Sequence, residues 1–307
     1  MKIIVFASGR GSNFEALIKA SQKFNSYNIV GLICDKECPA MDIARKNNIP
    51  VSLINAKDAN SIITAVKNYS PDYIFLAGYM RIIPSEFIDA YPLRVVNIHP
   101  SLLPAFTGKD AILQAWNAKV KTTGVTIHYV NDKLDNGPII KQKQISVPER
   151  TLPDGLQRLE TKIHETEHEL YPLVAHELSS TPFDTLLISR CLLGENVRYD
   201  GGNKYSNRAE TAFKNFKGNK VKVCPEIEAG FPTPRDPITD ENREVLKEVE
   251  VASKKFIEKK LNTSKKILAI LKDRSPSCGV KSGQGVFTSM LYNKFGEDVL
   301  IVSEEEL

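Results

Sequence analysis

Apolar runs alternate with helical periods from the first residue of the chain. The runs KIIVFA, NIVGLIC, YIFLAGY and RVVNI are separated by amphipathic segments such as NFEALIKASQKF and AILQAWNAK. Strands without polar alternation that are separated by helices are typical of a parallel sheet covered on both faces. The pattern therefore predicts an α/β fold with an open, mostly parallel, twisted, Rossmann-like sheet.

The pattern changes after this region. GVTIHYV and PIIKQKQISV are joined by NDKLDNG, in which Asn136-Gly137 is a turn signal. This pair predicts two antiparallel strands appended to the sheet. The long amphipathic stretch LPDGLQRLETKIHETEHELYPLVAHEL then predicts a helix that closes the unit.

The strand pattern restarts after SSTPFD, which has the composition of a linker. DTLLISRC, KVKVCPEI, KKILAILK and DVLIVSE are four further strand candidates, with helices expected near 208–217, 240–261 and 286–294. We therefore predict two domains, at 1–178 and 184–307, joined by a linker at 179–183. The second is a smaller α/β unit.

Composition and charge narrow the class of protein. The 307 residues are 42% hydrophobic and 25% charged, and no apolar run approaches the roughly 18 residues that span a bilayer. The apolar stretch in MKIIVFASGR is too short for a signal-peptide core, so a cytoplasmic location is expected. A net charge of +4 with dispersed basic residues argues against nucleic acid as a partner. Small molecules are the expected partners, without a membrane, and the sequence leaves a homodimer open.

The segment SGRGSN at 8–13 is the first candidate site. Two glycines follow the first strand, and Ser12-Asn13 open a helix. Glycines let the backbone approach an anion, and free N–H groups at a helix N-terminus bind phosphate. The alternative is a tight turn in which Asn13 is an ordinary helix cap.

Four further polar features fall on the same predicted sheet. They are the Met80-Arg81 step in AGYMRII, Asn97 with His99 in NIHPSLLP, Asp135 in KLDNGPII, and Glu167 on the closing helix. Ligands of open parallel sheets bind beyond the carboxyl ends of the strands, where the first three loops must lie. Each residue alone has an ordinary structural explanation, as a cap, a turn or a hydrogen-bonded histidine, but their order together favours one shared crevice.

The motifs SGRGSN, AGYMRII, NIHPSLLP, LDNGP and EHELYPL make residues 1–178 resemble the glycinamide ribonucleotide transformylases, which move a formyl group from 10-formyltetrahydrofolate to the amine of 5'-phosphoribosylglycinamide in purine biosynthesis. The resemblance implies a formyltransferase fold with folate as cosubstrate. It places the substrate phosphate at Gly11, Ser12 and Asn13, and the glycinamide end near Glu167. It places folate at Met80, Arg81, Ile82, Ile83 and Asn97.

The same resemblance makes Asn97, His99 and Asp135 the catalytic trio. An amine attacking a formyl carbon creates an oxyanion, which Asn97 and His99 can stabilise by about 3 kcal/mol per donor. Asp135 can hold His99 protonated and accept the amine proton directly or through water. The sequence departs from the family in AFTGKDA, where Thr107 replaces a usual proline and no histidine follows, although Lys109 offers a charge.

Three of the five cysteines follow predicted strands of the second domain: Cys191, Cys224 and Cys278. If those strands are parallel, the three thiols can converge at one sheet edge. Three thiolates without a nearby histidine suit an iron–sulfur cluster with one iron left open. The alternative is that they are three small buried hydrophobic side chains.

The blocks SRCLLGENVRYDGG, CPEIEAGFPTPRDP and LKDRSPSCG resemble the thiouracil-desulfurase-like family over 184–307. The resemblance implies a [4Fe-4S] cluster held by the three cysteines, which takes sulfur from a thiolated base. Glu226 and Ser275 become candidates for proton transfer or substrate orientation. The segment VKSGQGVF is shorter than is usual in this family, which implies a reshaped pocket.

The leading hypothesis is a fusion of a folate-dependent transformylase with an iron–sulfur domain that desulfurates thiolated bases. One rival is another formyltransferase, acting on methionyl-tRNA or a sugar, since HPSLLP recurs among them. The other rival makes the second domain a non-catalytic cluster-binding sensor that regulates the first.

Overall fold

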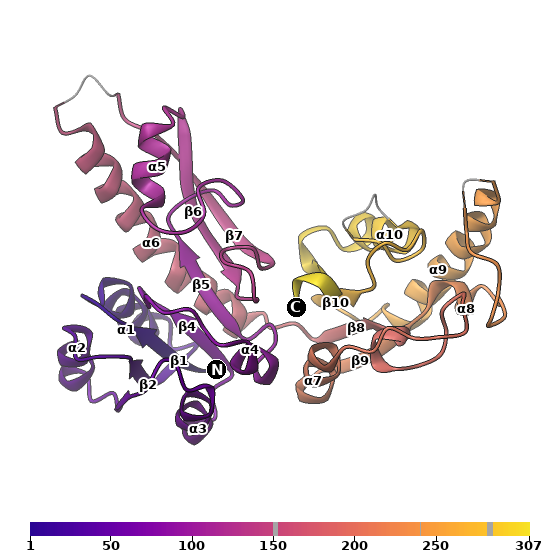
Figure 1. Ribbon diagram of the computed structural model, residues 1–307, viewed down its shortest axis with the longest axis horizontal. Helices are drawn as coiled ribbons and strands as arrows, with labels where there is room; N and C mark the ends of the chain where they lie inside the picture. The colour runs from indigo at the N-terminus through magenta and orange to yellow at the C-terminus, as the bar shows by residue number, and fades with distance from the viewer. Residues whose placement is uncertain (150–152, 240, 281–284) are drawn as a thin grey trace. The chain divides into compact units, whose positions relative to one another are not determined.

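The computed structural model describes residues 1–149, 153–239, 241–280 and 285–307. The chain divides into two compact units, Met1–Ser180 and Thr181–Leu307 (Figure 1). The helix α6, Gly155–Ser180, runs two residues into the segment 179–183 predicted as a linker. Its last turn is held because the Ser179 hydroxyl donates to the Ser26 carbonyl and Ser180 Oγ lies 3.2 Å from His176 Nδ1.

The first unit is built on a seven-stranded sheet in the order β3-β2-β1-β4-β5-β6-β7. The strands are β1 (Lys2–Ala7), β2 (Asn28–Cys34), β3 (Val51–Leu53), β4 (Tyr73–Leu76), β5 (Val95–His99), β6 (Thr122–Tyr129) and β7 (Ile139–Ser146). The first five run parallel, and β6 and β7 are antiparallel additions, as the alternation of strands and helices predicts.

Helices connect the parallel strands: α1 (Ser12–Phe24), α2 (Ala40–Lys46), α3 (Ala59–Tyr69) and α4 (Ser85–Ala90). The helix α5 (Ala111–Asn117) leads from β5 to the antiparallel strand β6. The local sequence explains their ends. Asp58, for example, caps α3 by accepting from the backbone N–H groups of Asn60 and Ser61. The strands β1 and β4 and the helices α3 and α4 share a core of buried aliphatic and aromatic side chains.

The closing helix α6 is tied to the centre of the sheet through Tyr171. Its buried hydroxyl donates to the carbonyls of Leu76, at the end of β4, and Val96, in β5. Along the helix, apolar residues that include Leu159, Ile163 and Leu170 are buried. The helix packs against α1, β6 and β7 (Figure 1), so its polar residues reach the same sheet edge as the strand ends.

The second unit has a four-stranded sheet in the order β11-β10-β8-β9, all parallel. Its elements are β8 (Thr185–Ser189), α7 (Asn207–Asn215), β9 (Asn219–Val223), α8 (Pro225–Glu228), α9 (Leu246–Lys260), β10 (Ile267–Leu271), α10 (Val286–Phe295) and β11 (Val299–Ser303), with short 3-10 turns η1 (Arg190–Leu193), η2 (Arg243–Val245), η3 (Gly296–Asp298) and η4 (Glu304–Glu306). The prediction of two α/β domains is confirmed.

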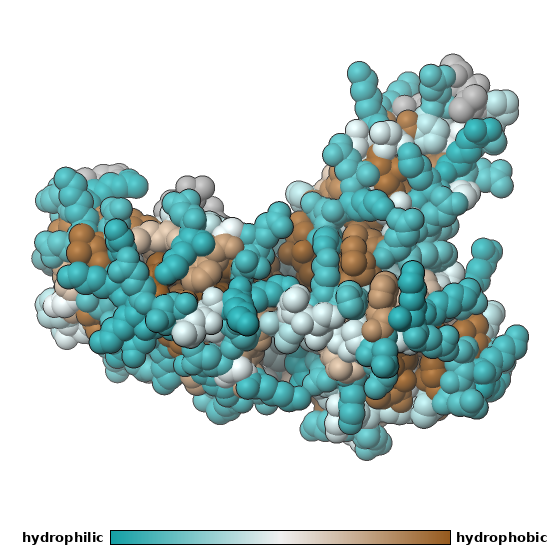
Figure 2. Space-filling model, turned by 180° about the vertical axis from the view of Figure 1, so that it is seen from behind, coloured by the Kyte–Doolittle hydropathy of each residue, from teal (hydrophilic) through white to brown (hydrophobic). Residues whose placement is uncertain are grey.

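The strands of this unit bury side chains on both faces, since all residues of β8 and β10 are buried. Phe256 of α9 and Phe287 of α10 join the core beside β10. Hydrophilic side chains cover most of the surface drawn in Figure 2, with hydrophobic patches between them. No helix within the described ranges is both long and apolar enough to cross a membrane.

Candidate active sites

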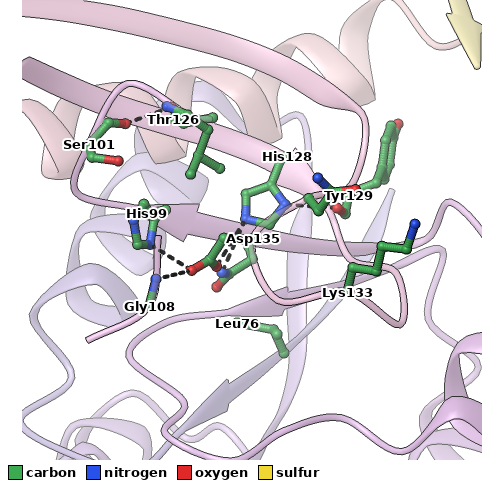
Figure 3. Close-up of polar contacts among 12 residues, drawn as sticks. Leu76, His99, Ser101, Gly108, Thr126, His128, Tyr129, Lys133 and Asp135 are labelled. Atoms are coloured by element: carbon green, nitrogen blue, oxygen red, sulfur yellow. Dashed lines mark hydrogen bonds and ion pairs between the residues drawn. The ribbon is translucent and has the colours of Figure 1, made fainter. Parts of the chain in front are cut away.

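The first site lies at the carboxyl end of β5, where Asn97 and His99 were predicted (Figure 3). His99 is buried, and both of its ring nitrogens face acceptors. Nδ1 lies 3.4 Å from Asp135 Oδ2, and Nε2 lies 2.8 Å from the carbonyl oxygen of Phe106. The carboxylate and the carbonyl thus fix the orientation of the His99 ring from both sides.

Asp135 enters this site from the turn between β6 and β7. Its backbone has φ 51°, in the left-handed region that aspartate tolerates better than most residues. The carboxylate is 9% exposed, and Oδ2 also accepts from the Gly108 N–H at 2.8 Å. The turn geometry and this hydrogen bond aim the carboxylate at His99.

The loop AFTGKDA contributes through its backbone. The Phe106 carbonyl contacts His99, and the Gly108 N–H contacts Asp135. Thr107 and Lys109 are exposed, and their carbonyls accept from the Gln114 side chain, which holds the loop to α5. The departure from the family pattern therefore falls in a loop whose backbone, whatever its side chains, supports His99 and Asp135.

His128, on β6, belongs to this site and was not among the predicted residues. It is the cross-strand partner of Asn97, and its Nε2 lies 3.3 Å from Asn97 Nδ2. Nδ1 lies 2.8 Å from the Tyr129 carbonyl, so Nδ1 carries the proton of the neutral ring and Nε2 accepts from Asn97. Burial lowers the pKa of His128 from its ordinary value, which favours this neutral form.

A signal for His128 is present in the sequence. RVVNIH and GVTIHY form neighbouring antiparallel strands, and side chains directly opposite in such a pair share one face. Locating the histidine opposite Asn97 requires the register, which the strand sequences alone leave open.

The turn between β1 and α1 presents the predicted phosphate-binding residues. Gly11 precedes α1 with φ 82°, and a Cβ at this position would lie 2.9 Å from the Ala40 Cβ, so both backbone and space require glycine. No side chain caps α1 among the described residues, so Asn13 is not the ordinary cap of the alternative interpretation. The first N–H groups of the helix, including those of Ser12 and Asn13, are left to face a ligand or water.

Asn13 instead contacts the closing helix. Its Nδ2 donates to Glu167 Oε2 at 3.1 Å, while its Oδ1 is buried without a hydrogen-bond partner among the described residues. The same Glu167 oxygen lies 3.1 Å from Nδ1 of His164, a second residue that the sequence did not single out. The hydrogen bond to Glu167 raises the pKa of His164. The turn and the helix thus share one hydrogen-bonded cluster.

The segment that follows β4 separates into exposed and buried parts. Met80 and Ile82 are 76% and 84% exposed, whereas the Ile83 side chain is buried in the core of the first unit. Arg81 donates through Nε to Asp35 Oδ2 at 2.7 Å, which fixes the step between the two exposed side chains. This step therefore leaves two large apolar side chains open to solvent.

The second site is a cavity of about 220 Å³ at the carboxyl ends of β8, β9 and β10. The three predicted cysteines line it together: Cys191 from η1, Cys224 before α8, and Cys278 from the loop after β10. The parallel order β10-β8-β9 makes these strand ends neighbours. The predicted convergence of the three thiols on one cavity therefore occurs.

The three thiols resist ionisation in this cavity. Burial is the main cause, and it raises the pKa of Cys191 to about 11 and those of Cys224 and Cys278 above their ordinary value. The Cys224 thiol donates to the Val197 carbonyl at 3.8 Å. No group of three or more metal-ligating side chains is arranged to hold a metal ion in the described part of the chain.

Glu226 and Ser275 also line the cavity, and both are engaged within the protein. Glu226 Oε2 accepts from Arg235, with Nε at 2.8 Å, and Oε1 accepts from the Ser277 hydroxyl at 2.8 Å. Ser275 Oγ accepts from the N–H groups of Ser277 and Cys278, which leaves its hydroxyl hydrogen for another partner. The shortened segment VKSGQGVF contains residues 281–284, which lie outside the described residues.

The matching family models agree with this division into two sites. The formyl transferase model matches residues 1–175, more than half of the chain, and the 2-thiouracil desulfurase model matches residues 186–305. The chain therefore belongs to the formyl transferase family, and its second unit is a 2-thiouracil desulfurase domain fused to the first.

Individual relatives show which kind of formyl transferase the first unit is similar to. The chain is 41% identical over 186 residues to the phosphoribosylglycinamide formyltransferase of Bacillus subtilis, covering 58% of this chain and 94% of that protein. It is 34% identical to the chloroplastic enzyme of Arabidopsis thaliana, covering 55% of this chain and 62% of the relative. The crystal structure of phosphoribosylglycinamide formyltransferase from Bacillus halodurans matches with 42% identity and a TM-score of 0.55, over 59% of this chain and 96% of that one. The first unit is thus a homologue of the phosphoribosylglycinamide formyltransferases.

Proposed function

We propose that the first unit transfers a formyl group from 10-formyltetrahydrofolate to the amine of 5'-phosphoribosylglycinamide. The observation that carries the proposal is a chain of contacts at one sheet edge, in which Asn97 meets His128, His128 lies 3.8 Å from Asp135, and Asp135 lies 3.4 Å from His99. The amine attacks the formyl carbon, its proton leaves, and the tetrahydrofolate nitrogen departs with a proton as the carbonyl re-forms. The trio supplies groups for each of these changes.

Asn97 is suited to bind the oxyanion because His128 holds its amide. One N–H of Nδ2 faces His128, so the second N–H remains for the reacting oxygen. A donor held in place in this way costs little reorganisation during the reaction, which is the source of its value of about 3 kcal/mol.

His99 needs one rearrangement before it can act. Its Nε2 faces the Phe106 carbonyl, and its Nδ1 faces Asp135. The Phe106 carbonyl and a substrate oxyanion would compete for the same N–H, so this loop has to yield when substrate binds. Asp135 orients the ring through Nδ1 and, with a water, can accept the amine proton.

Substrate binding is assigned to the groups around this trio. The open N–H groups of Gly11, Ser12 and Asn13 suit the phosphate. Glu167 and the unpartnered Asn13 Oδ1 suit the amine and hydroxyl donors of the glycinamide ribonucleotide. The exposed apolar side chains of Met80 and Ile82 suit the pterin ring of folate, with Arg81, the Ile83 backbone and Asn97 beside them.

The binding assignment is tested by Asn13→Ala in the full chain. KM for 5'-phosphoribosylglycinamide should rise by more than KM for 10-formyltetrahydrofolate, because Asn13 is assigned to the substrate phosphate and not to folate. Equal rises in both constants would mean that the phosphate assignment is wrong.

For the second unit we propose a [4Fe-4S] cluster bound by Cys191, Cys224 and Cys278, with a thiolated nucleobase as substrate. Three thiols that line one cavity are a suitable donor set, because thiolates are the usual ligands of such clusters. When bound, a cluster with an open iron would supply a soft acceptor for the sulfur of the base. Ser275 has a free hydroxyl hydrogen to orient that base, and Arg235 fixes the Glu226 carboxylate beside the cavity through an ion pair.

A non-catalytic cluster-binding sensor is the second candidate. The pairing of Glu226 with both Arg235 and Ser277 favours it, since neither carboxylate oxygen is left without a partner for proton transfer. Anaerobic reconstitution followed by assay on 4-thiouracil and 2-thiouracil separates the two. Release of sulfide supports the desulfurase, whereas a cluster-loaded protein inert on both bases supports the sensor.

A further inference from the structure

Two cysteines of the first unit take no part in either proposed site. Cys34 is the last residue of β2, and Cys38 lies in the turn before α2. Their sulfur atoms are 3.7 Å apart, with the Cys38 thiol directed at Cys34. Two thiols in direct contact can be joined with little movement, since a disulfide bond is about 2.05 Å long.

The two thiols differ in access. Cys34 is fully buried, while Cys38 is only partly buried at the start of its turn. Burial raises the pKa of Cys34 to about 12, and the contact with Cys38 adds to the rise. Cys38 is therefore the thiol that a dissolved oxidant reaches, and Cys34 is the thiol placed to attack the product.

The turn between these cysteines is connected to the Met80-Arg81 step. Asp35 follows Cys34 directly, and its side chain is only 2% exposed. Its two oxygens accept from the Ser8 hydroxyl at 2.6 Å and from Arg81 Nε at 2.7 Å. The Ser8 oxygen in turn accepts from the Met80 N–H at 3.1 Å. A change in the turn at 34–38 therefore reaches Met80 and Arg81 through Asp35.

We propose that Cys34 and Cys38 form an oxidisable dithiol, a modification site for hydroperoxides, whose disulfide weakens folate binding through Asp35. The Cys38 thiolate attacks hydrogen peroxide, giving a sulfenic acid and hydroxide. The Cys34 sulfur then displaces the sulfenic oxygen, and the two steps convert two thiols and one peroxide into one disulfide and two waters. The proximity of the second thiol favours this step over reaction with outside thiols.

The sequence allows a direct test of the bond. Lys36 lies between the two cysteines, so trypsin cuts the chain between them and releases the peptides 24–36 and 37–45 separately. In the full chain treated with hydrogen peroxide, the two peptides should appear as one cross-linked species that separates on reduction. Cys38→Ser should abolish that species while leaving transformylase activity of the reduced protein unchanged.

The predicted effect of the disulfide on folate binding rests on the proposed function of the first unit. After oxidation, KM for 10-formyltetrahydrofolate should rise by at least about fivefold, the lower end of ordinary coupling factors. KM for 5'-phosphoribosylglycinamide should change less, and reduction should restore both. Cys38→Ser should lose this response to peroxide.

The two measurements test separate parts of the proposal, peptide mapping the disulfide and the kinetics its effect on folate binding. Sulfinic acid at Cys38 or a bond to another cysteine, in place of the cross-linked pair, overturns the dithiol. A cross-link without a change in the folate KM overturns the coupling through Asp35. A reduced protein that does not use 10-formyltetrahydrofolate would instead reject the proposed function, and peptide mapping would still decide the disulfide.

Discussion

The two sites occupy the same place in two sheets, the carboxyl ends of parallel strands, but they are held together differently. In the first, Asn97 contacts His128, and His99 contacts the Phe106 carbonyl. Asp135 joins His99 to the Gly108 N–H (Figure 3). In the second, the three thiols share a cavity but are not arranged as a metal site in the described part of the chain. The chain assembles the first site from its own atoms, whereas the proposed cluster would have to draw the three thiols of the second together.

The largest effect should come from breaking the first site. Asp135→Asn keeps an acceptor for the Gly108 N–H but removes the charge beside His99. General acid–base groups contribute about 10²- to 10⁴-fold, so kcat for formyl transfer should fall by that amount. Steady-state kinetics on the full chain measure it. The exposed Asp132, three residues away, provides the matched control Asp132→Asn, and near-wild-type turnover in Asp135→Asn would reject the trio.

The second site should lose its bound group when one thiol is removed. Cys224→Ser, reconstituted anaerobically, should retain little iron or acid-labile sulfide, because two thiolates and a hydroxyl are a poor donor set. Formyl transfer should be unchanged in the same sample. Cys38→Ser is the matched control and should bind iron like the wild type. Equal iron in both variants would remove Cys224 from the ligand set.

A smaller effect is expected from His128→Ala, which removes the partner of Asn97. The donor remains but is less well placed, so kcat should fall by about tenfold, less than the 10²- to 10³-fold loss of a whole oxyanion donor. KM for both substrates should change little. A loss confined to KM would mean that His128 supports binding and does not position Asn97.

The smallest effect concerns stability against pH. The pKa of His128 is lower in the folded protein than its ordinary value of 6.5. As the pH falls, His128 therefore becomes protonated at a higher pH in the unfolded chain than in the folded one. The contribution of His128 is complete above about pH 6.5 and is lost progressively below it. Chemical unfolding between pH 7.5 and pH 5.5 should show a flatter acid decline for His128→Gln than for the wild type. Parallel declines would contradict the buried neutral ring.

The two parallel sheets and the residues at their strand ends could be predicted from the sequence, because hydrophobic patterning and turn residues determine them. Runs such as KIIVFA and ILAIL are apolar on both faces, which requires covered parallel strands. Asn136-Gly137 marks the turn that brings Asp135 to the sheet edge. The three cysteines were found because each follows a strand of one parallel sheet.

The site features that the sequence did not reveal depend on strand register and on contacts made by backbone groups. His128 was missed because only the pairing of β5 with β6 places it opposite Asn97. The supports at Phe106 and Gly108 use a carbonyl and an N–H that nearly any residue could supply. The core position of Ile83 was hidden because this residue directly follows three exposed residues, Met80 to Ile82, in a segment without strand or helix periodicity.

The central claim is that the first site serves 5'-phosphoribosylglycinamide, and a substrate comparison tests it most directly. The full chain, purified without oxygen and supplied with 10-formyltetrahydrofolate, is assayed on 5'-phosphoribosylglycinamide, methionyl-tRNA and an amino sugar. We predict formyl transfer to 5'-phosphoribosylglycinamide that Asp135→Asn lowers by about 10²- to 10⁴-fold, and none to the other two. Transfer to methionyl-tRNA or the sugar in its place would contradict the account.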